Sequence, residues 1–174
     1  MKRYTFKVLL LGAPSVGKTS IFYRYIKNQF LQDYITTIGI NYLAKEIILE
    51  GKKIAKLVIS DIAGHEKFKV LRKEFYAGAN GALLIFDLTQ LKTYEALEDW
   101  ISEMFEILQD NIPFIIIGNK VDLVEEFARS IDQNIVRSYA EKKDSTYLET
   151  SAKTGENIED VFKELAQRMI KRIS

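Results

Sequence analysis

The sequence predicts a three-layer α/β fold, in which helices cover both faces of a mostly parallel β-sheet. Apolar stretches of strand length alternate along the chain with stretches whose apolar residues have helical spacing. Residues 83–86 and 114–117 are continuously apolar, which is typical of parallel strands covered on both faces. We therefore expect a sheet of about six strands, with one antiparallel strand at an edge.

The expected strands follow from apolar runs bounded by turn residues. In chain order they are residues 4–11, 40–49, 53–60, 81–87, 113–118 and 145–149. The second and third are separated only by a short turn at Gly51, so they should form an antiparallel hairpin. A helix or a long loop separates every other consecutive pair, and this spacing favours parallel crossovers.

Four segments have the apolar periodicity of amphipathic helices. They are residues 18–28, 93–109, 131–142 and 157–172. The apolar stripe of the second consists of Tyr94, Leu97, Trp100, Ile101, Met104 and Leu108, and that of the last of Ile158, Val161, Phe162, Leu165, Met169 and Ile173. Ser130 and Gln133 have the spacing of a capping box at the start of the third.

Composition limits the classes of function. A length of 174 residues suits one domain, residues 1–174. The formal net charge of +1 gives no reason to expect nucleic-acid binding. The absence of cysteine excludes disulfides, thiolate zinc sites, and prenyl or palmitoyl anchors in this chain. We expect a monomeric cytoplasmic protein, without a lipid anchor in this chain, that reaches a membrane only through partners.

Residues 12–19 fit the phosphate-binding pattern G-x-x-x-x-G-K-[ST], between an expected strand and an expected helix. Gly12 and Gly17 allow backbone conformations in which successive N–H groups point at a phosphate. The start of the following helix adds partial positive charge. Lys18 would lie between the outer phosphates, and the Thr19 hydroxyl would bind Mg²⁺. The alternative is an ordinary glycine-containing turn, which the flanking strand and helix make less favourable.

Two further strands end in polar residues, where ligands bind in such sheets. Asp61 and Gly64 follow residues 53–60, so the carboxylate can hold the hydration shell of Mg²⁺ and the glycine N–H can meet a terminal phosphate. Taken alone, they also fit a surface turn. Asp122, after residues 113–118, can accept the two adjacent N–H donors that guanine presents and adenine lacks.

Residues near Asp122 in the sequence could also contact the guanine base. Asn119 can bond the base and tie the loop, and the stem of Lys120 can lie over the ring. The backbone N–H groups of residues 150–153, after the last expected strand, can meet the guanine carbonyl oxygen.

These four elements, in this order, resemble those of small GTP-binding proteins of the Ras superfamily. The chain is most similar to the Rab branch in residues 34–40, 61–68, 75–79 and 149–153. The resemblance covers nearly the whole chain and implies the P-loop NTPase (small G-protein) fold. It also implies a GTP/GDP switch with slow intrinsic hydrolysis, which serves intracellular signalling or vesicle trafficking.

The resemblance assigns site residues by position. Phe30 would pack edge-on against guanine, Tyr34 would close over the phosphates, and Thr37 would bind Mg²⁺ and touch the γ-phosphate. The expected nucleotide-binding residues are Pro14, Ser15, Val16, Gly17, Lys18, Thr19, Ser20, Phe30, Tyr34, Thr37, Gly64, Asn119, Lys120, Asp122, Leu123, Ser151, Ala152 and Lys153. The expected catalytic residues are Lys18, Thr37, Gly64 and His65, and the expected magnesium ligands are Thr19, Thr37 and Asp61. A GTPase-activating protein, an exchange factor and effectors would bind residues 30–40 and 62–77.

The sequence departs from the family pattern at several positions. His65 stands where the resemblance predicts a water-orienting glutamine, and its geometry and reach differ from those of a carboxamide. Two hypotheses remain open: hydrolysis is slow, or a partner supplies the water-positioning group. Pro14 lacks an N–H donor, and Ser60 replaces the tryptophan usual in Rab proteins, which puts Rab-type effector recognition in doubt.

Two alternative functions also remain. One is a P-loop ATPase or kinase, which residues 119–122 disfavour. The other is a pseudo-GTPase, a scaffold that holds nucleotide and binds partners without turnover, and its motivation is His65 together with Pro14.

Overall fold

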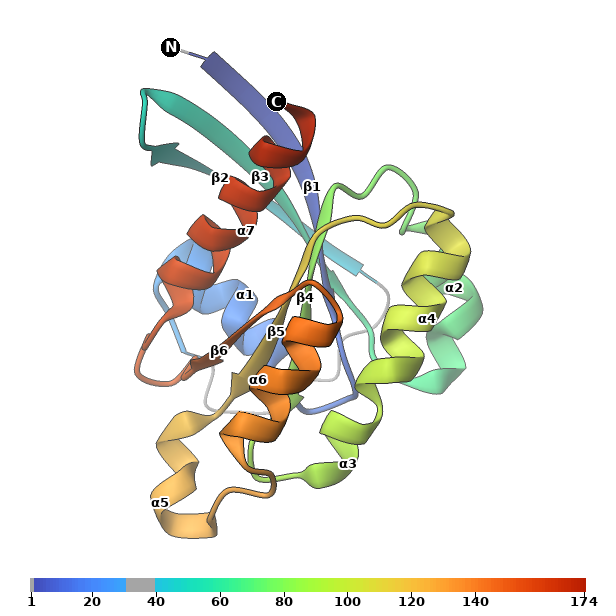
Figure 1. Cartoon of the computed structure of the whole chain (residues 1–174), viewed down its shortest axis with the longest axis vertical. Coiled ribbons are helices and arrows are strands. Elements are labelled where there is room, and N and C mark those ends of the chain that lie inside the picture. The colour runs from blue at the N-terminus through green and yellow to red at the C-terminus, as the bar shows by residue number, and fades with distance from the viewer. Residues whose placement is uncertain (1, 31–39) are drawn as a thin grey trace.

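The computed structural model describes residues 2–30 and 40–174. Its six-stranded sheet has the order β2-β3-β1-β4-β5-β6, and among these strands only the β2–β3 pair is antiparallel (Figure 1). The strands are β1 (Lys2–Leu11), β2 (Ile40–Leu49), β3 (Lys53–Ile62), β4 (Gly81–Asp87), β5 (Phe114–Asn119) and β6 (Thr146–Thr150). This arrangement confirms the predicted fold class and the predicted hairpin.

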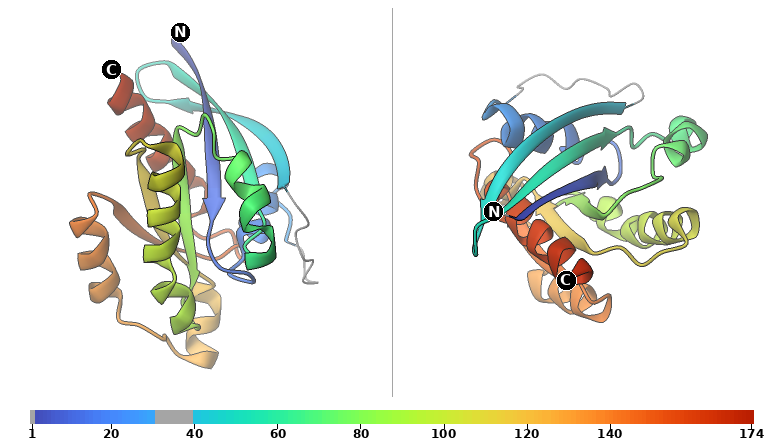
Figure 2. Two further views of the ribbon diagram at one scale, coloured as in Figure 1. Left: turned by 90° about the vertical axis from the view of Figure 1, so that its right-hand side faces the viewer. Right: turned by 90° about the horizontal axis from the view of Figure 1, so that it is seen from above.

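Helices cover both faces of the sheet (Figure 2). They are α1 (Lys18–Lys27), α2 (Lys69–Glu74), α3 (Leu91–Glu95), α4 (Leu97–Leu108), α5 (Val124–Phe127), α6 (Gln133–Lys142) and α7 (Ile158–Ile173), with short 3₁₀ turns η1 (Glu66–Phe68) and η2 (Val121–Leu123). One apolar core lies between the sheet and α1 with α7, and the other lies between the sheet and α4 with α6. Every residue of β4 and β5 is buried, as the continuous apolar runs predicted.

The sequence prediction was wrong for the shorter helical elements. The predicted helix 93–109 is two helices, α3 and α4, with a break at Ala96. The elements α2, α5, η1 and η2 were missed because each spans six residues or fewer, too short for an apolar stripe to show. α2 also has a tertiary contact that no local pattern shows, since Arg72 bonds Glu103 of α4.

Two local predictions at helix ends were also wrong. Asp132 is the N-cap of α6, and its Oδ1 accepts the N–H of Asn134 at 2.7 Å. Ser130 instead donates its hydroxyl to the carbonyl oxygen of Leu88 at 2.8 Å, so it does not form the capping box. In α7, Ile170 is buried, whereas Ile173 in the last turn is 61% exposed.

The topology places a switch point of the sheet at the carboxyl end of β1. The chain passes from β1 to β3 on one side and then crosses to β4 on the other, so β1 lies at a topological switch point. Ligands bind at such points in α/β sheets. β3 is two residues longer than predicted because Ile62 pairs with Ile40 of β2, and this pairing includes Asp61 in the strand. The sheet therefore holds Asp61 beside Leu10, near the carboxyl end of β1.

Candidate functional site

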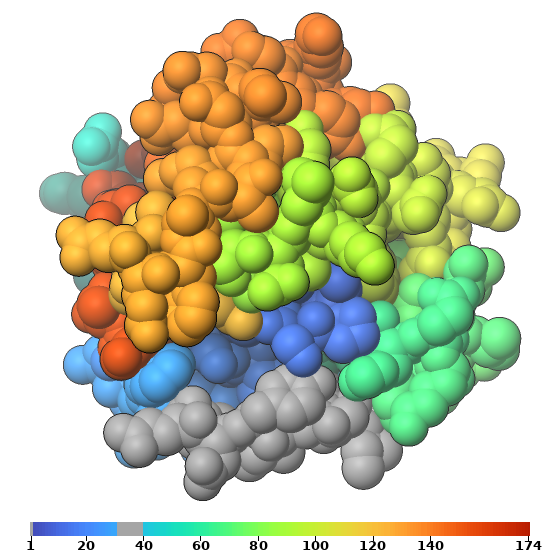
Figure 3. Space-filling model, turned by 90° about the horizontal axis from the view of Figure 1, so that it is seen from below, coloured from blue at the N-terminus to red at the C-terminus, as the bar shows by residue number. Residues whose placement is uncertain are grey.

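The loop between β1 and α1 has a backbone that only glycine suits at its end. Gly17 is the N-cap of α1 with φ of 99°, in the left-handed region. A Cβ atom there would lie 2.3 Å from Nδ2 of Asn119. Val16 is fully buried and anchors the loop, whereas Ser15 is exposed. Figure 3 shows this end of the molecule, where the blue atoms of the loop lie between the segments that follow other strands.

Lys18, at the start of α1, folds back over this loop. Its Nζ donates to the carbonyl oxygens of Gly12 at 2.7 Å and Ala13 at 2.8 Å. Burial lowers the pKa of Lys18 to about 8, and the nearby charge of Asp61 opposes this shift. A Cβ atom on Gly64 would lie 2.7 Å from the same Nζ. The loop, the ammonium group and Gly64 therefore converge on one point.

Thr19 and Asp61 place two oxygen donors beside this point. The hydroxyl of Thr19 donates to Oδ2 of Asp61 at 2.6 Å, and Asp61 is fully buried. Within the described residues, no cluster of three or more histidine, aspartate or glutamate side chains is arranged to hold a metal. Mg²⁺ is usually held by one or two protein ligands together with phosphates and water, so the two residues fit that ion.

Asn119, at the end of β5, joins two loops. Its Nδ2 donates to the carbonyl oxygen of Val16 at 2.9 Å, in the phosphate loop. Its Oδ1 accepts from the hydroxyl of Thr150 at 3.0 Å and from the N–H of Ala152 at 3.4 Å, in the segment after β6. The side chain is buried, so these bonds are protected from water.

Lys120 extends this link to β4. Its Nζ donates to the carbonyl oxygen of Ser15 at 2.7 Å and lies 2.7 Å from Oδ2 of Asp87. Sequence reasoning missed Asp87, although it occupies the carboxyl end of β4. The rule that polar residues gather where strands end would have found it.

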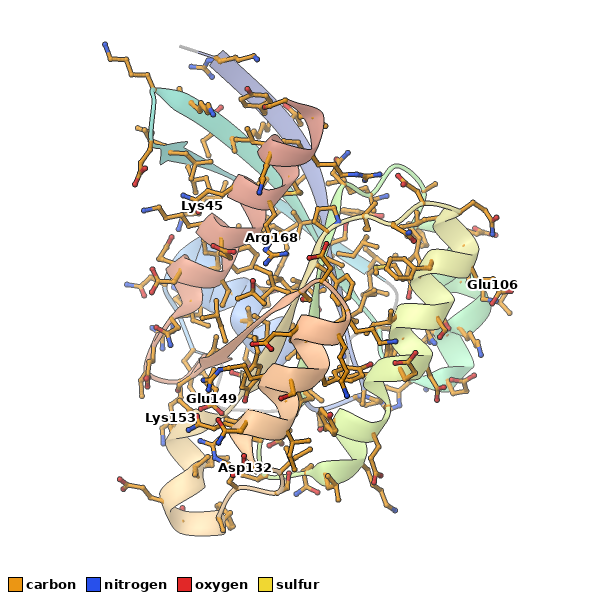
Figure 4. The ribbon with its side chains drawn as sticks, in the orientation of Figure 1. Lys45, Glu106, Asp132, Glu149, Lys153 and Arg168 are labelled. Carbon is orange, nitrogen blue, oxygen red and sulfur yellow. The ribbon has the colours of Figure 1, made fainter. Side chains whose placement is uncertain are left out.

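The segment after β6 is held on two sides. The hydroxyl of Ser151 donates to Oδ1 of Asp122 at 2.6 Å. Arg24 of α1 donates to the carbonyl oxygens of Ala152 and Lys153 on the other side. Arg24 was also missed, because nothing in its local sequence indicates a partner after β6. Lys153 itself is exposed, and its position is labelled in Figure 4.

The structure brings together the predicted residues at the ends of β1, β3, β5 and β6. Other predicted residues lie around them. Pro14, Ser15 and Ser20 lie in or beside the loop between β1 and α1. Leu123 lies in η2, and its N–H donates to the carbonyl oxygen of Lys120. Phe30 is 36% exposed. Tyr34 and Thr37 lie outside the described residues.

His65 follows Gly64 at the edge of this site. Its carbonyl oxygen accepts from the N–H of Phe68 at 3.0 Å and from Nη1 of Arg72 at 3.1 Å. Its Nε2 is buried, and it has no hydrogen-bond partner within residues 2–30 and 40–174. The backbone of His65 is thus fixed by α2.

The fold and the glycine-bounded loop before α1 define a nucleotide-binding protein with the P-loop GTPase fold. Comparison with known proteins narrows this class. A sequence model described as "Ras family" matches residues 7–171. Ras-related protein Rab-21 from Bos taurus is 40% identical over 169 residues, which cover 97% of this chain and 75% of that protein.

Two further relatives agree. Ras-related protein Rab-7b from Bos taurus is 37% identical, over 98% of this chain and 85% of its own length. Ras-related protein RabJ from Dictyostelium discoideum is 38% identical, over 94% of this chain and 63% of its own length. The chain belongs to the Ras family, and it is a small GTPase similar to Rab proteins. Among the described helices, none is both long and apolar enough to span a bilayer.

Proposed function

We propose that this protein is a guanine-nucleotide switch that binds GTP with Mg²⁺ and hydrolyses it slowly to GDP. The proposal rests on one observation above the others. Asn119 bonds the loop before α1, the end of β6 and the segment that follows it, so it would hold a phosphate site and a base site together. A nucleotide can span the two, since both lie at the carboxyl edge of the sheet.

At the phosphate end, the carbonyl oxygens of Gly12 and Ala13 and the charge of Asp61 partly balance the buried ammonium of Lys18. A phosphate would relieve that burial cost. The N–H groups of residues 15–20 and of Gly64 would donate to phosphate oxygens, while Pro14 has no N–H to donate. Bound Mg²⁺ would neutralise phosphate charge, and Thr19, Asp61 and Thr37 would hold it.

At the base end, Asp122 would accept from the guanine amino and ring N–H groups. Asn119 and the backbone N–H groups of residues 151–153 would bond the rest of the base edge. The stem of Lys120, together with Leu123 and Phe30, would cover the ring faces. The Asp122 carboxylate would remain unsatisfied against adenine, which gives selectivity for guanine.

For hydrolysis, Lys18 would stabilise the charge that develops on the γ-phosphate. Gly64 would donate its N–H to that phosphate, and His65 would orient the attacking water together with Thr37. Imidazole offers one donor and one acceptor at a different reach from a glutamine carboxamide, so we expect slow turnover.

The output of such a switch is the choice of partner. Residues 30–40 and 62–77 would bind effectors, an exchange factor and a GTPase-activating protein. By analogy with Rab proteins, we propose a role in vesicle trafficking or signalling in the cytoplasm. Contact with membranes would come through these partners.

Mass analysis of the nucleotide that co-purifies with the protein tests the proposal. We expect GDP or GTP, and we expect a large excess of unlabelled ATP to leave labelled GDP bound. Co-purified adenine nucleotide, or displacement of GDP by ATP, would contradict guanine specificity.

A second candidate is a pseudo-GTPase that retains GTP without turnover, and His65 favours it. Product release measured over several hours, with and without cell extract, separates the two. Phosphate release in either condition supports a GTPase, whereas no release in both supports a scaffold.

A further inference from the structure

Arg24 reaches from α1 to the segment that follows β6. Its Nε donates to the carbonyl oxygen of Ala152 at 2.7 Å, and its Nη2 donates to that of Lys153 at 2.5 Å. Its Nη1 donates to Oδ1 of Asn28 at 3.2 Å, at the end of the same helix. The guanidinium plane therefore engages two successive carbonyl groups, a geometry for which its fixed fork of donors is suited.

These bonds fix the orientation of the loop as well as its position. The C=O and N–H groups of a trans peptide lie in one plane and point in opposite directions. Because Arg24 holds the carbonyl of Ala152, the N–H of the same peptide, which belongs to Lys153, points away from α1. The loop is anchored at its other side by Ser151, which bonds Asp122 at 2.6 Å and accepts the N–H of Thr154 at 3.0 Å.

Arg24 also links the two ends of the site. α1 begins at Lys18, so the helix that starts at the phosphate loop holds the loop on the base side through Arg24. We propose that Arg24 is a positioning residue for nucleobase recognition: it holds the peptide between Ala152 and Lys153 so that the N–H of Lys153 faces the carbonyl oxygen of guanine. Arg24 acts through the loop and does not touch the nucleotide. This inference rests on the proposed function.

The test measures release of nucleotide from the full chain, with three fluorescent ribose-labelled diphosphates. Guanosine diphosphate has both the carbonyl and the amino group, inosine diphosphate keeps the carbonyl alone, and 2-aminopurine riboside diphosphate keeps the amino group alone. We expect Arg24→Ala to speed release of the first two by roughly 10- to 100-fold, the range for loss of charged hydrogen bonds. Release of the third should change by less than about twofold, because it lacks the group that the loop would bind.

Two variants make the result specific. Arg24→Lys keeps the charge and one donor group, so its release rates should lie between those of wild type and Arg24→Ala. Arg168→Ala is the matched control, because Arg168 also bonds a main-chain carbonyl, that of Asp144 at 3.1 Å, but it lies well away from Lys153 in Figure 4. We expect wild-type release rates from it.

Unchanged release of guanosine diphosphate from Arg24→Ala would overturn the inference. Equal acceleration of all three nucleotides would also overturn it, since that result would indicate general loosening. If wild type itself shows no preference for GDP over ADP, the proposed function fails and the inference with it. If wild type prefers GDP and the Arg24 variants behave like it, the inference alone fails.

Discussion

At the scale of single residues, His65 offers the most direct test of the proposed hydrolysis. It follows Gly64, and its Nε2 has no bonding partner among the residues that the structure describes. We expect His65→Gln to raise the rate of single-turnover GTP hydrolysis by roughly tenfold, a part of what a positioned proton-transfer group contributes. The release of labelled GDP should not change, because His65 lies at the phosphate end. Quenched-flow measurement of phosphate formation checks this.

The control for that prediction is His65→Ala, which removes the imidazole without adding a carboxamide. It should hydrolyse GTP no faster than wild type. If His65→Gln is also no faster, slow hydrolysis does not arise from this position, and the hypothesis that a partner supplies the water-positioning group gains support.

Asp122 is the residue on which the proposed base selectivity depends. We expect Asp122→Ala to reduce the preference for GDP over ADP on the order of 100-fold or more, since the paired acceptor for guanine is lost. Equilibrium competition between the two nucleotides measures this ratio. Ser151→Ala removes the 2.6 Å bond to the carboxylate and the bond from the N–H of Thr154, but it leaves Asp122 in place, so it should reduce the ratio less. A ratio that stays the same in Asp122→Ala would contradict the assignment.

Some of the candidate site could be predicted from sequence because its residues are close together in the chain. Lys18 and Thr19 belong to one contiguous pattern, and Asp122 lies three residues after the end of a recognisable strand. Arg24 could not be predicted in this way, because its bond to Ala152 spans 128 residues. Arg72 is similar, since its partner Glu103 is 31 residues away on another helix. Such contacts arise from packing, which local periodicity does not encode.

At the scale of secondary-structure elements, a buried ion pair attaches α2 to α4. Arg72 and Glu103 share two hydrogen bonds, of 3.0 and 3.1 Å, and Tyr76 donates to the same carboxylate at 2.8 Å. The guanidinium carbon also lies 4.4 Å from the ring centroid of Trp100. Arg72 is only 3% exposed, and the buried Glu103 is its nearer carboxylate partner, since the exposed Glu66 lies 3.9 Å away. The segment that follows His65 is therefore attached to α4 through Glu103.

Removing one partner of this pair should destabilise the protein strongly. We expect Glu103→Leu to lower the free energy of unfolding by about 3–5 kcal/mol, because the buried charge of Arg72 loses its close partner and keeps only the more distant, exposed Glu66 among the described residues. Arg72→Met combined with Glu103→Leu should recover most of that loss. Urea denaturation of the single and double variants measures both effects.

The control for the buried pair is an exposed one. Glu46 pairs with Arg3 at 3.3 Å, and both side chains are more than half exposed. Glu46→Leu should therefore lower the free energy of unfolding by less than about 1 kcal/mol. Equal losses from Glu103→Leu and Glu46→Leu would show that burial does not govern the α2–α4 contact.

The stability contributed by a second contact, between α4 and α6, should depend on pH. Glu98 of α4 accepts from Lys143 at 2.7 Å and from Tyr139 of α6 at 2.6 Å. These bonds lower the pKa of Glu98 below its ordinary value. The stability they add is therefore present above the ordinary glutamate pKa and is lost as the pH falls through the lowered value.

Glu98→Gln should therefore melt slightly below wild type at pH 7, by about 2–4 °C at most, because exposed ion pairs contribute up to about 1 kcal/mol. At acidic pH, where Glu98 is protonated, the two melting temperatures should converge. Glu106→Gln, at an exposed position of α4 labelled in Figure 4, should follow wild type at both pH values. A difference in melting temperature between wild type and Glu98→Gln that grows at acidic pH would contradict the lowered pKa of Glu98.

The strands and the long helices were predicted from sequence, whereas the short helical elements α2, α5, η1 and η2 were not. β2 was predicted with its observed bounds, and α7 to within a residue, since each is long enough to show its periodicity. At six residues α2 is too short for that, and its position depends on the contact of Arg72 with α4. Sequence periodicity detects elements whose burial repeats, whereas it misses those held by one or two side chains.

At the scale of the whole molecule, the site is assembled from the ends of four strands. The carboxyl ends of these strands, β1, β3, β5 and β6, lie at the same end of the sheet. Two separate apolar cores support the two faces of the sheet. The parallel order of this sheet followed from connection lengths, since a helix or long loop between strands requires a crossover. A ligand that contacts all four strand ends would bind the folded chain and not the unfolded one, so it should stabilise the entire fold.

Thermal unfolding with and without nucleotide tests this coupling. With Mg²⁺ and GDP at about 100 times its dissociation constant, the folded state gains about 2.7 kcal/mol, which raises the melting temperature by roughly 5–10 °C for a chain of this size. Lys18→Ala should show no such rise, because the ammonium that converges with Gly64 on the phosphate site is gone. ADP at the same concentration should not stabilise wild type, because Asp122 would reject its base. Equal stabilisation by ADP and GDP would mean that the phosphate loop binds independently of the base side, and that the bonds of Asn119 to both loops do not join them into one site.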